Sequence, residues 1–289
     1  MDNKDNKPCL DYNKKVNSFY DLVKKWTVND FHTPGIKAEV IIDMLISEFV
    51  PDIVSKFLSE KGKPEANLVL LAKEFPVKSI SGDKSPYVLN QTNRNAKVDY
   101  LLADERTETL YYAELKTTTD SFDDKQLIRM IYSQYEGVEK AFCFYEDVMK
   151  VRTSKAQKEK TEKQKNTLLS QLDLDRIDEI KDKYKEISTV YITLAGIGEK
   201  KSFDENINIK SESECVELNR ETTINENGEE LTVTVMRNNK KSTVHVPIIN
   251  LREFNEAYKA NNVTAWNDIW RILNECLDKE KVSCQPTQK

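Results

Sequence analysis

Two carboxylates and one amine lie in neighbouring apolar segments of this 289-residue chain, where they could act together on a substrate. Asp99 lies in the segment KVDYLL, and Glu114 and Lys116 lie in the segment YAELK. Because side chains alternate across a β-strand, Glu114 and Lys116 are expected on one face and Leu115 on the other. Carboxylates and an amine in this arrangement are groups that can bind a divalent metal and assist an attacking water.

The two segments are expected to pair as a β-hairpin. If its turn is centred between Arg106 and Thr107, Asp99 lies opposite Glu114. Directly opposite residues have Cβ atoms about 4.5–5.5 Å apart, and two like charges there are destabilising unless a cation lies between them. Mg²⁺ or Mn²⁺ prefers such oxygen ligands and fills its remaining positions with water and substrate phosphate. Lys116 beside the metal would orient or deprotonate the water, or stabilise charge on the phosphate oxygens.

Structural roles are the alternative for the same side chains. Glu114 and Lys116 could form a salt bridge across the strand surface. Asp99 could be the partner of Lys97 or of Lys116. The residue types alone keep both of these roles open.

A buried helix is predicted over residues 36–50, because apolar residues cover nearly its whole circumference. Glu39 and Asp43 fall together in one narrow sector of this helix. A buried charge there needs a partner. Glu39 could reach the carboxylate cluster as a further metal ligand, directly or through water, or it could be satisfied by Lys37 or Lys73.

The remaining segments alternate between strand-like and helix-like patterns, which predicts an α/β domain with a central mixed sheet flanked by helices. Strands are predicted over residues 67–73, 96–104, 109–116, 141–145 and 188–195, and helices over residues 121–136 and within 153–186. A β-hairpin is predicted where two alternating segments, 216–224 and 230–236, flank the turn-like sequence NENG. A helical tail is predicted over residues 251–277, whose stripe of Trp266, Trp270, Ile272 and Leu273 is typical of a core-facing helix. We therefore expect a helical lead-in over residues 1–33, a main domain over 34–198 and an extension of hairpin plus helix over 199–289.

This arrangement resembles the PD-(D/E)xK nuclease superfamily, which includes many restriction endonucleases, Holliday-junction resolvases and repair exonucleases. The resemblance covers roughly residues 34–146, or as far as residue 195. It implies a restriction-endonuclease-like core in the order helix, three antiparallel strands, helix, strand. The family's metal-binding Asp corresponds to Asp99, and its E-x-K pair corresponds to Glu114 and Lys116.

The resemblance also implies supporting residues. The family's acidic residue on the first helix corresponds to Glu39, and the backbone carbonyl of Leu115 would complete the metal shell. In some branches a Gln on the next helix holds the site or the DNA, and Gln126 is its counterpart here. Two departures from the family pattern are visible: Val98 replaces the proline of the motif, and the spacing from Gln126 to Tyr132 is not that of the branch with a Gln and Tyr pair.

Any binding of nucleic acid must use a local surface patch, because the net charge of −5 is not that of a protein coated in positive charge. The stretch 150–165 contains seven basic residues and two acidic ones. With Lys125 and Arg129, this stretch is the predicted phosphate-binding surface, and Arg152 and Lys155 are its expected contacts. A solvated helix face is the alternative explanation for the same charges.

Composition excludes several other kinds of site and indicates a soluble, cytoplasmic protein with no membrane segment. The N-terminus is polar and lacks the apolar run of a signal peptide or a membrane helix. Five scattered cysteines without a C-x-x-C pair argue against a disulfide framework and a zinc site. Only His32 and His245 are present, so a Ser-His-Asp triad has little to work with.

We expect an Mg²⁺-dependent nuclease that hydrolyses phosphodiester bonds of nucleic acid, DNA rather than RNA. The alternative is a catalytically inactive module of the same fold that binds nucleic acid or a protein partner. A third interpretation, an α/β interaction protein whose charged helices within residues 153–186 contact a partner, leaves the facing Asp99 and Glu114 unexplained. The sequence does not choose between endonuclease and exonuclease, and it leaves a homodimer open as the assembly.

Overall fold

The computed structural model describes residues 38–62, 66–77, 96–117, 122, 124–151, 176–194, 216–217, 223–224, 230–237, 240–252 and 267–275. The chain divides into two compact units, Met1–Leu45 with Asn262–Lys289 and Ile46–Asn261. The sheet and the candidate site belong to the unit Ile46–Asn261. The other unit contains all but the last residue of α2 (Ala38–Ile46) and a helix at residues 267–275.

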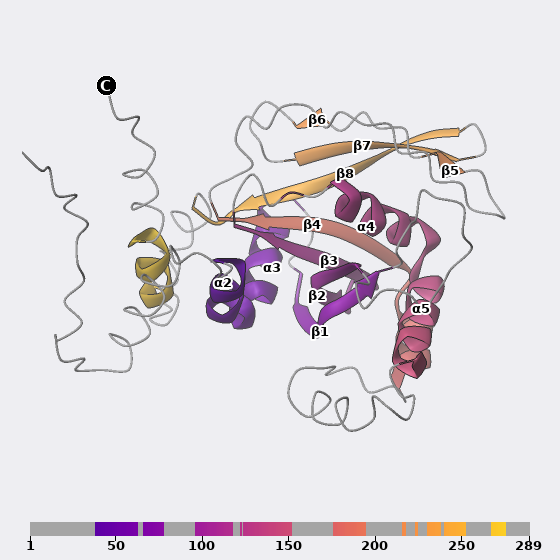
Figure 1. The fold of residues 1–289 in the computed structure, drawn as a ribbon, viewed down its shortest axis with the longest axis horizontal. Coiled ribbons are helices and arrows are strands. Elements are labelled where there is room, and N and C mark those ends of the chain that lie inside the picture. The colour runs from indigo at the N-terminus through magenta and orange to yellow at the C-terminus, as the bar shows by residue number, and fades with distance from the viewer. Residues whose placement is uncertain are drawn as a thin grey trace, which may run out of the picture. The chain divides into compact units, whose positions relative to one another are not determined.

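A mixed sheet forms the centre of the unit Ile46–Asn261 (Figure 1). Its order is β1-β2-β3-β4-β8-β7-β5, and β6 pairs with β7 beside this path. The strands are β1 (Leu68–Val77), β2 (Ala96–Asp104), β3 (Thr109–Lys116), β4 (Glu186–Thr193), β5 (Val216–Glu217), β6 (Thr223–Ile224), β7 (Glu230–Arg237) and β8 (Lys240–Asn250). The first three strands are antiparallel, whereas β4 runs parallel to β3 and β8 runs parallel to β4. The predicted α/β class with a mixed sheet is therefore confirmed.

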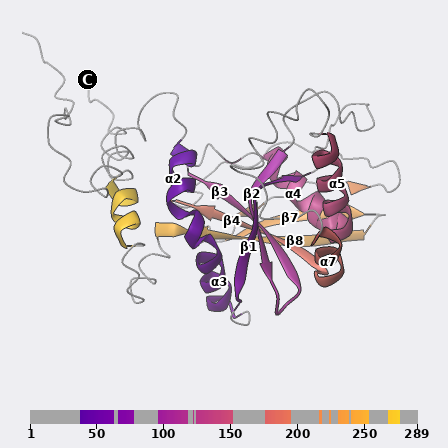
Figure 2. The same ribbon diagram turned by 90° about the horizontal axis from the view of Figure 1, so that it is seen from below.

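Helices cover both faces of the strands β1 to β3. Figure 2 shows α3 (Val50–Glu60) on one side of these strands and α4 (Asp124–Glu136), α5 (Val138–Val151) and α7 (Ile177–Lys183) on the other. Gly137, at φ +87°, ends α4 in the left-handed conformation that glycine adopts without strain. Among the described residues, no helix combines the length and the apolar content needed to cross a bilayer.

Aromatic packing holds α5 against β1. The rings of Phe75 and Tyr145 are stacked with centroids 5.2 Å apart, and Phe142 packs against Phe75 at 5.4 Å. All three side chains are buried. Because truncating a buried aromatic ring to Ala typically costs roughly 3–5 kcal/mol, this cluster is a main anchor between helix and sheet.

The predicted strand at residues 141–145 is wrong. These residues lie within α5, and Ala141, Phe142 and Tyr145 form its buried face. Phe142 and Tyr145 follow Ala141 by one and four positions, which places all three on one helix face. A run of five apolar residues in the sequence nevertheless fits a buried strand as well as a buried helix. The strand that follows the helices is β4, as predicted over residues 188–195.

Helical structure near the N-terminus extends further than predicted and is interrupted. The part of the predicted helix 36–50 that the structure describes, from Ala38, consists of α2, a single 3₁₀ turn (Ser47–Phe49) and the start of α3, which continues to Glu60. Ile42, Ile46 and Val50 are buried, but Met44 is 75% exposed. The expectation that this helix is buried around nearly its whole circumference is therefore wrong.

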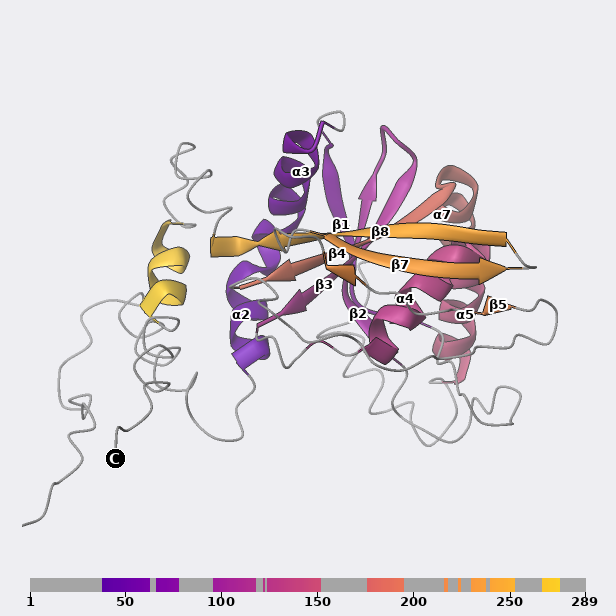
Figure 3. The same ribbon diagram turned by 90° about the horizontal axis from the view of Figure 1, so that it is seen from above.

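The C-terminal hairpin is an extension of the central sheet (Figure 3). Strands β5 and β6 both pair antiparallel with β7, as the predicted hairpin requires. Strand β8 was not predicted; it pairs with β7 from Lys240 to Pro247 and with β4 from Ile248 to Asn250. Pro247 stands immediately before the residues that pair with β4, where its missing N–H interrupts no registered pair with that strand.

The predicted helical tail is described only in part. Residues 251–252 and 267–275 are helical, and Trp270, Ile272 and Leu273 are buried as expected of a core-facing stripe. Trp266 and the rest of the tail lie outside the described residues, as does the N-terminal lead-in at residues 1–33.

Candidate functional site

The β2–β3 hairpin brings the predicted residues together. Its registered pairs run from Tyr100 opposite Ala113 to Asp104 opposite Thr109, which is the register predicted from a turn between Arg106 and Thr107. The turn is held by the Asp104 carboxylate, which accepts hydrogen bonds from the Arg106 N–H at 3.0 Å and the Thr107 hydroxyl at 2.9 Å. Asp99 lies one residue beyond the last registered pair, opposite Glu114.

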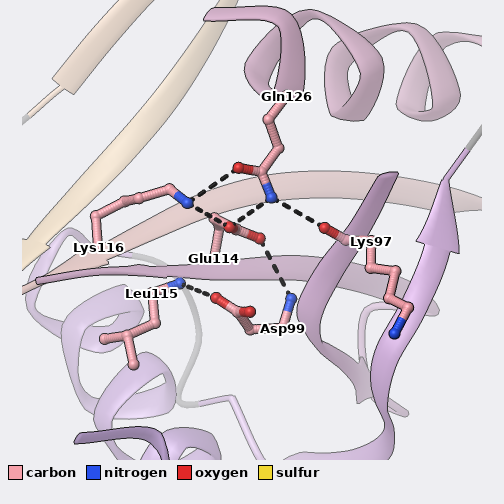
Figure 4. A network of polar contacts seen from close by, with 6 residues as sticks. All are labelled: Lys97, Asp99, Glu114, Leu115, Lys116 and Gln126. Carbon is pink, nitrogen blue, oxygen red and sulfur yellow. Dashed lines mark hydrogen bonds and ion pairs between the residues drawn. The ribbon is translucent and has the colours of Figure 1, made fainter. Parts of the chain in front are cut away.

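Asp99 and Glu114 are joined by reciprocal hydrogen bonds from side chain to backbone (Figure 4). The Leu115 N–H donates to Asp99 Oδ2 at 2.7 Å, and the Asp99 N–H donates to Glu114 Oε2 at 3.2 Å. In a regular antiparallel ladder the Leu115 N–H would instead bond to a β2 carbonyl. The Asp99 carboxylate therefore lies at the point where β2 and β3 diverge.

Glu114 is also one partner of a buried ion pair. Lys116 Nζ is 2.6 Å from Glu114 Oε1, and the two side chains are only 6% and 2% exposed. Gln126 Nε2 donates to the same Glu114 oxygen at 2.6 Å, and Lys116 Nζ donates to Gln126 Oε1 at 3.0 Å. Glu114, Lys116 and Gln126 thus form a closed ring of hydrogen bonds between β3 and α4.

This ring is expensive to bury. Removing two charges from water costs several kcal/mol for each ion, and a buried pair is often no more stable than apolar residues of similar volume. Packing stability alone therefore gives little reason for a lysine and a glutamate at these positions. A requirement for both charges at this point of the sheet is a better explanation.

Polar contacts fix α4 over the site. Besides its bonds to Glu114 and Lys116, Gln126 Nε2 donates to the Lys97 carbonyl oxygen at 2.9 Å, so one amide joins α4 to both β2 and β3. Two turns further along α4, the Ser133 hydroxyl is 2.9 Å from the Tyr112 hydroxyl. Burial raises the pKa of Tyr112 above its ordinary value, so this hydroxyl stays protonated.

The backbone is strained next to Asp99. Glu74 has φ +55°, a conformation that non-glycine residues rarely adopt. Its neighbours pair regularly with β2, Lys73 with Tyr100 and Phe75 with Val98, so Glu74 lies opposite Asp99. Left-handed backbone at a non-glycine residue costs on the order of 1–3 kcal/mol and is common beside functional sites.

A second ion pair lies at the exposed edge of the site. Lys97 Nζ is 2.6 Å from Glu74 Oε2, with side chains 38% and 50% exposed. From the sequence, Lys97 was expected only as a possible partner of Asp99, and Glu74 was not predicted as a site residue. The position of Lys97 two residues before Asp99 was a usable signal, because it predicts a shared strand face.

The Leu115 carbonyl faces the side that the metal prediction requires. The Leu194 N–H donates to the Lys116 carbonyl at 3.2 Å, so the Lys116 carbonyl points toward β4. Consecutive carbonyls along a strand point to opposite edges. The Leu115 carbonyl therefore points toward β2, on the side where the Leu115 N–H meets Asp99.

The other predicted site residues are described less fully. Glu39 lies in α2, but its side chain is outside the described residues, and so is that of Lys125 on α4. Arg129 is half-buried on α4, one turn after Gln126. Arg152 and Lys155, with most of the basic stretch 150–165, lie outside the described residues.

Tyr132, the residue noted beside Gln126 in the sequence, is buried in the core. It belongs to the same apolar cluster as Phe75 and Tyr145. The structure therefore describes it as a packing residue of α4.

The donors present are suited to a hard cation such as Mg²⁺, which is often held by one or two carboxylates together with substrate phosphate. Asp99 and Glu114 supply two such carboxylates, which are held near each other by hydrogen bonds from the backbone N–H groups of Asp99 and Leu115. No cluster of three or more His, Cys, Asp or Glu side chains that could hold a metal occurs in the part of the chain whose side chains are described. The side chain of Glu39 is outside that part.

Searches against protein-family models, curated proteins and solved structures found no match to this chain. The function is therefore inferred from the contacts of the side chains around Glu114.

Proposed function

We propose that the chain is a metal-dependent nuclease that hydrolyses phosphodiester bonds of nucleic acid, with DNA as the expected substrate. The observation that carries the proposal is the cluster of Asp99, Glu114, Lys116 and Gln126 at the divergence of β2 and β3, in which the ion pair of Glu114 and Lys116 is buried. Carboxylates, an amine and an amide in one cluster are the groups that phosphodiester hydrolysis with a divalent metal requires.

The order of elements supports the same proposal. Helices α2 and α3 precede three antiparallel strands, and helices α4, α5 and α7 precede β4, which runs parallel to β3. The PD-(D/E)xK superfamily has the order helix, three antiparallel strands, helix, strand. Asp99 on the second strand, and Glu114 and Lys116 on the third, lie where that family has its metal-binding Asp and its E-x-K pair.

Each side chain has a distinct task in the proposed reaction. Asp99 and Glu114 would hold Mg²⁺ or Mn²⁺, with the Leu115 carbonyl as a further oxygen donor. The bound metal would supply positive charge to the phosphate and lower the pKa of a bound water. Lys116 Nζ, held at 2.6 Å from Glu114 as an ammonium group, would orient the attacking water and stabilise negative charge developing on the phosphate. Gln126 would keep Glu114 and Lys116 in place.

A catalytically inactive module is the second candidate, and one observation favours it. Glu114 Oε1 accepts hydrogen bonds from both Lys116 and Gln126, so the ring is satisfied by protein groups. A fold that binds nucleic acid or a protein partner without cleaving would keep such a ring as a structural element. The buried charges of this ring, whose cost packing does not explain, favour the nuclease.

The test is cleavage of linear, circular, branched and single-stranded DNA and RNA in Mg²⁺, Mn²⁺ or EDTA. We expect cutting in the presence of metal and none in EDTA, and loss of cutting in Glu114→Ala and Lys116→Ala variants that remain folded. A folded wild-type protein that cuts no member of the panel with either metal would contradict the proposal. Salt-sensitive binding without cutting would then favour the inactive module.

A further inference from the structure

We propose that Lys97 binds a substrate phosphate at the exposed edge of the site, and that Glu74 competes with nucleic acid for the Lys97 ammonium group. The inference rests on the proposed nuclease function and adds a residue pair that controls how substrate enters. It makes Glu74 a built-in competitor whose removal strengthens binding.

Lys97 is tied to the site through its backbone. Its carbonyl oxygen accepts a hydrogen bond from Gln126 Nε2, the nitrogen that also donates to Glu114. Lys97 is two residues before Asp99 on β2, so the two side chains leave the same face of the strand, about 6.6 Å apart along it at a rise of about 3.3 Å per residue. In Figure 4 the Lys97 side chain lies across the cluster from that of Lys116.

The charges around the carboxylates are uneven. Lys116 compensates Glu114 on the buried side, at 6% exposure, whereas Lys97 is 38% exposed. A phosphate that approaches Asp99 and Glu114 meets two negative groups, and an accessible cation beside Asp99 reduces that repulsion. Lys97 is such a cation, because its backbone belongs to β2 and its side chain is 38% exposed.

Glu74 is an unusual partner for this lysine. It lies opposite Asp99 in the register of β1 and β2, at φ +55°, and presents its carboxylate 2.6 Å from the Lys97 ammonium group. A role as a third metal ligand is not supported, because the described side chains contain no group of three acidic or other ligating residues that could hold a metal. The placement of the Glu74 carboxylate next to Lys97 is better explained as occupation of a phosphate position.

The ion pair is weak enough to be exchanged. Ion pairs between solvent-exposed side chains contribute little to stability and are screened by salt. A phosphate oxygen can therefore replace the Glu74 carboxylate at little cost to the fold. The exchange uses only the side chains, and the bond from Gln126 to the Lys97 carbonyl survives it.

The experiment measures binding of a fluorescently labelled short DNA single strand and the corresponding duplex, in EDTA, over a series of salt concentrations. The variants are Lys97→Met, Lys97→Arg, Glu74→Gln and the double variant Lys97→Met/Glu74→Gln. The matched control is the ion pair of Lys183 and Glu105, which has the same 2.6 Å separation and side chains 44% and 62% exposed. Lys183→Met, at the end of α7, matches Lys97→Met in charge, and Glu105→Gln, in the turn after β2, matches Glu74→Gln.

We expect Lys97→Met to weaken duplex binding by roughly fivefold to tenfold near 0.1 M salt and to lower the salt slope by about 0.9, the effect of one lost phosphate contact. Lys97→Arg should retain binding. Glu74→Gln should strengthen binding about threefold or more at low salt, as expected when a competing charge is removed, and this gain should vanish in the double variant. Lys183→Met should weaken binding less than Lys97→Met does, and Glu105→Gln should strengthen it less than Glu74→Gln does.

Two results would overturn the inference while leaving the proposed function intact: Lys97→Met behaving like Lys183→Met, or the gain from Glu74→Gln persisting in the double variant, in a protein that still cuts DNA with metal. A wild-type protein that neither binds nor cuts any nucleic acid would overturn the proposed function and this inference together.

Discussion

The two ends of the β2–β3 hairpin each bury a carboxylate, but they use it differently. At the turn end, Asp104 is 1% exposed and accepts hydrogen bonds from the Arg106 N–H and the Thr107 hydroxyl. At the other end, Glu114 is equally buried but lies 2.6 Å from the Lys116 ammonium group and also accepts a bond from Gln126. Asp104 stabilises a turn by accepting hydrogen bonds from neutral donors, whereas Glu114 is buried together with the charged Lys116 ammonium group.

The difference supports placing the proposed chemistry at the Glu114 end of the hairpin. A carboxylate that accepts hydrogen bonds from its own turn lowers the free energy of that turn and needs no further explanation. A buried lysine and glutamate pair requires desolvation of both ions, which packing alone does not repay. Substitutions at the two ends should therefore have different effects on activity and on stability.

The largest expected effect is on cleavage. Glu114→Gln should lower the rate by roughly 10²–10⁴-fold, the range typical of a lost acid, base or charge-stabilising group. Asp104→Asn should leave the rate within a fewfold of wild type, because this carboxylate accepts its hydrogen bonds from the turn residues Arg106 and Thr107. Rates of DNA cleavage in Mg²⁺ at matched folded concentrations test the pair, and equal losses in both variants would remove the distinction between the two ends.

Stability should respond in a different way. Lys116→Met leaves the Glu114 charge buried without its cation, which should lower the free energy of unfolding by roughly 3–5 kcal/mol. The double variant Glu114→Gln/Lys116→Met removes both charges and should recover most of that loss, while remaining inactive. Urea unfolding monitored by circular dichroism measures both. A double variant as unstable as Lys116→Met would indicate that the pair serves the fold.

A smaller effect is expected at α4. Gln126→Met should lower activity about 10–100-fold, as is typical when a group that orients a metal ligand is removed. Ser133→Ala is the matched control, since Ser133 also joins α4 to β3 through the Tyr112 hydroxyl. This control should cost about 1 kcal/mol of stability and leave activity unchanged. Similar losses of activity in both variants would mean that Gln126 acts only by docking the helix.

The smallest effect concerns pH and the turn end. Burial raises the pKa of the Tyr184 hydroxyl, with the nearby Lys183 ammonium opposing the shift and Glu105 adding to it. The folded state therefore favours the protonated hydroxyl. This contribution to stability is fully present below the ordinary tyrosine pKa of about 10 and is lost as pH rises through the folded pKa. Tyr184→Phe should flatten the alkaline loss of stability, and an unchanged pH profile would contradict the assignment.

The hairpin and its residues could be predicted because they depend on local rules. Alternation along each strand and the position of one turn set the register that places Asp99 beside Glu114. The α/β class likewise follows from alternating patterns. The strand predicted at residues 141–145 was wrong because five apolar residues fit a buried strand and a buried helix equally well.

Other features depend on tertiary packing and leave no local signal. The contacts of Gln126 with Glu114, Lys116 and the Lys97 carbonyl exist only because α4 docks over the strands, and the family resemblance indicated Gln126 without showing these bonds. The left-handed backbone of Glu74 is set by its regularly paired neighbours. Strand β8 differs from these, because its alternating segment is a local strand pattern, which Pro247 interrupts.

The proposed function depends most directly on a metal site formed by Asp99 and Glu114. Titration of the purified protein with Mn²⁺ tests this site without knowledge of the substrate. Electron paramagnetic resonance measures the free ion at each step. The account predicts saturable binding that Asp99→Asn and Glu114→Gln each abolish or weaken about tenfold or more, while Asp104→Asn binds like wild type. Wild-type protein that binds no Mn²⁺, or binding that both site substitutions leave unchanged, would contradict it.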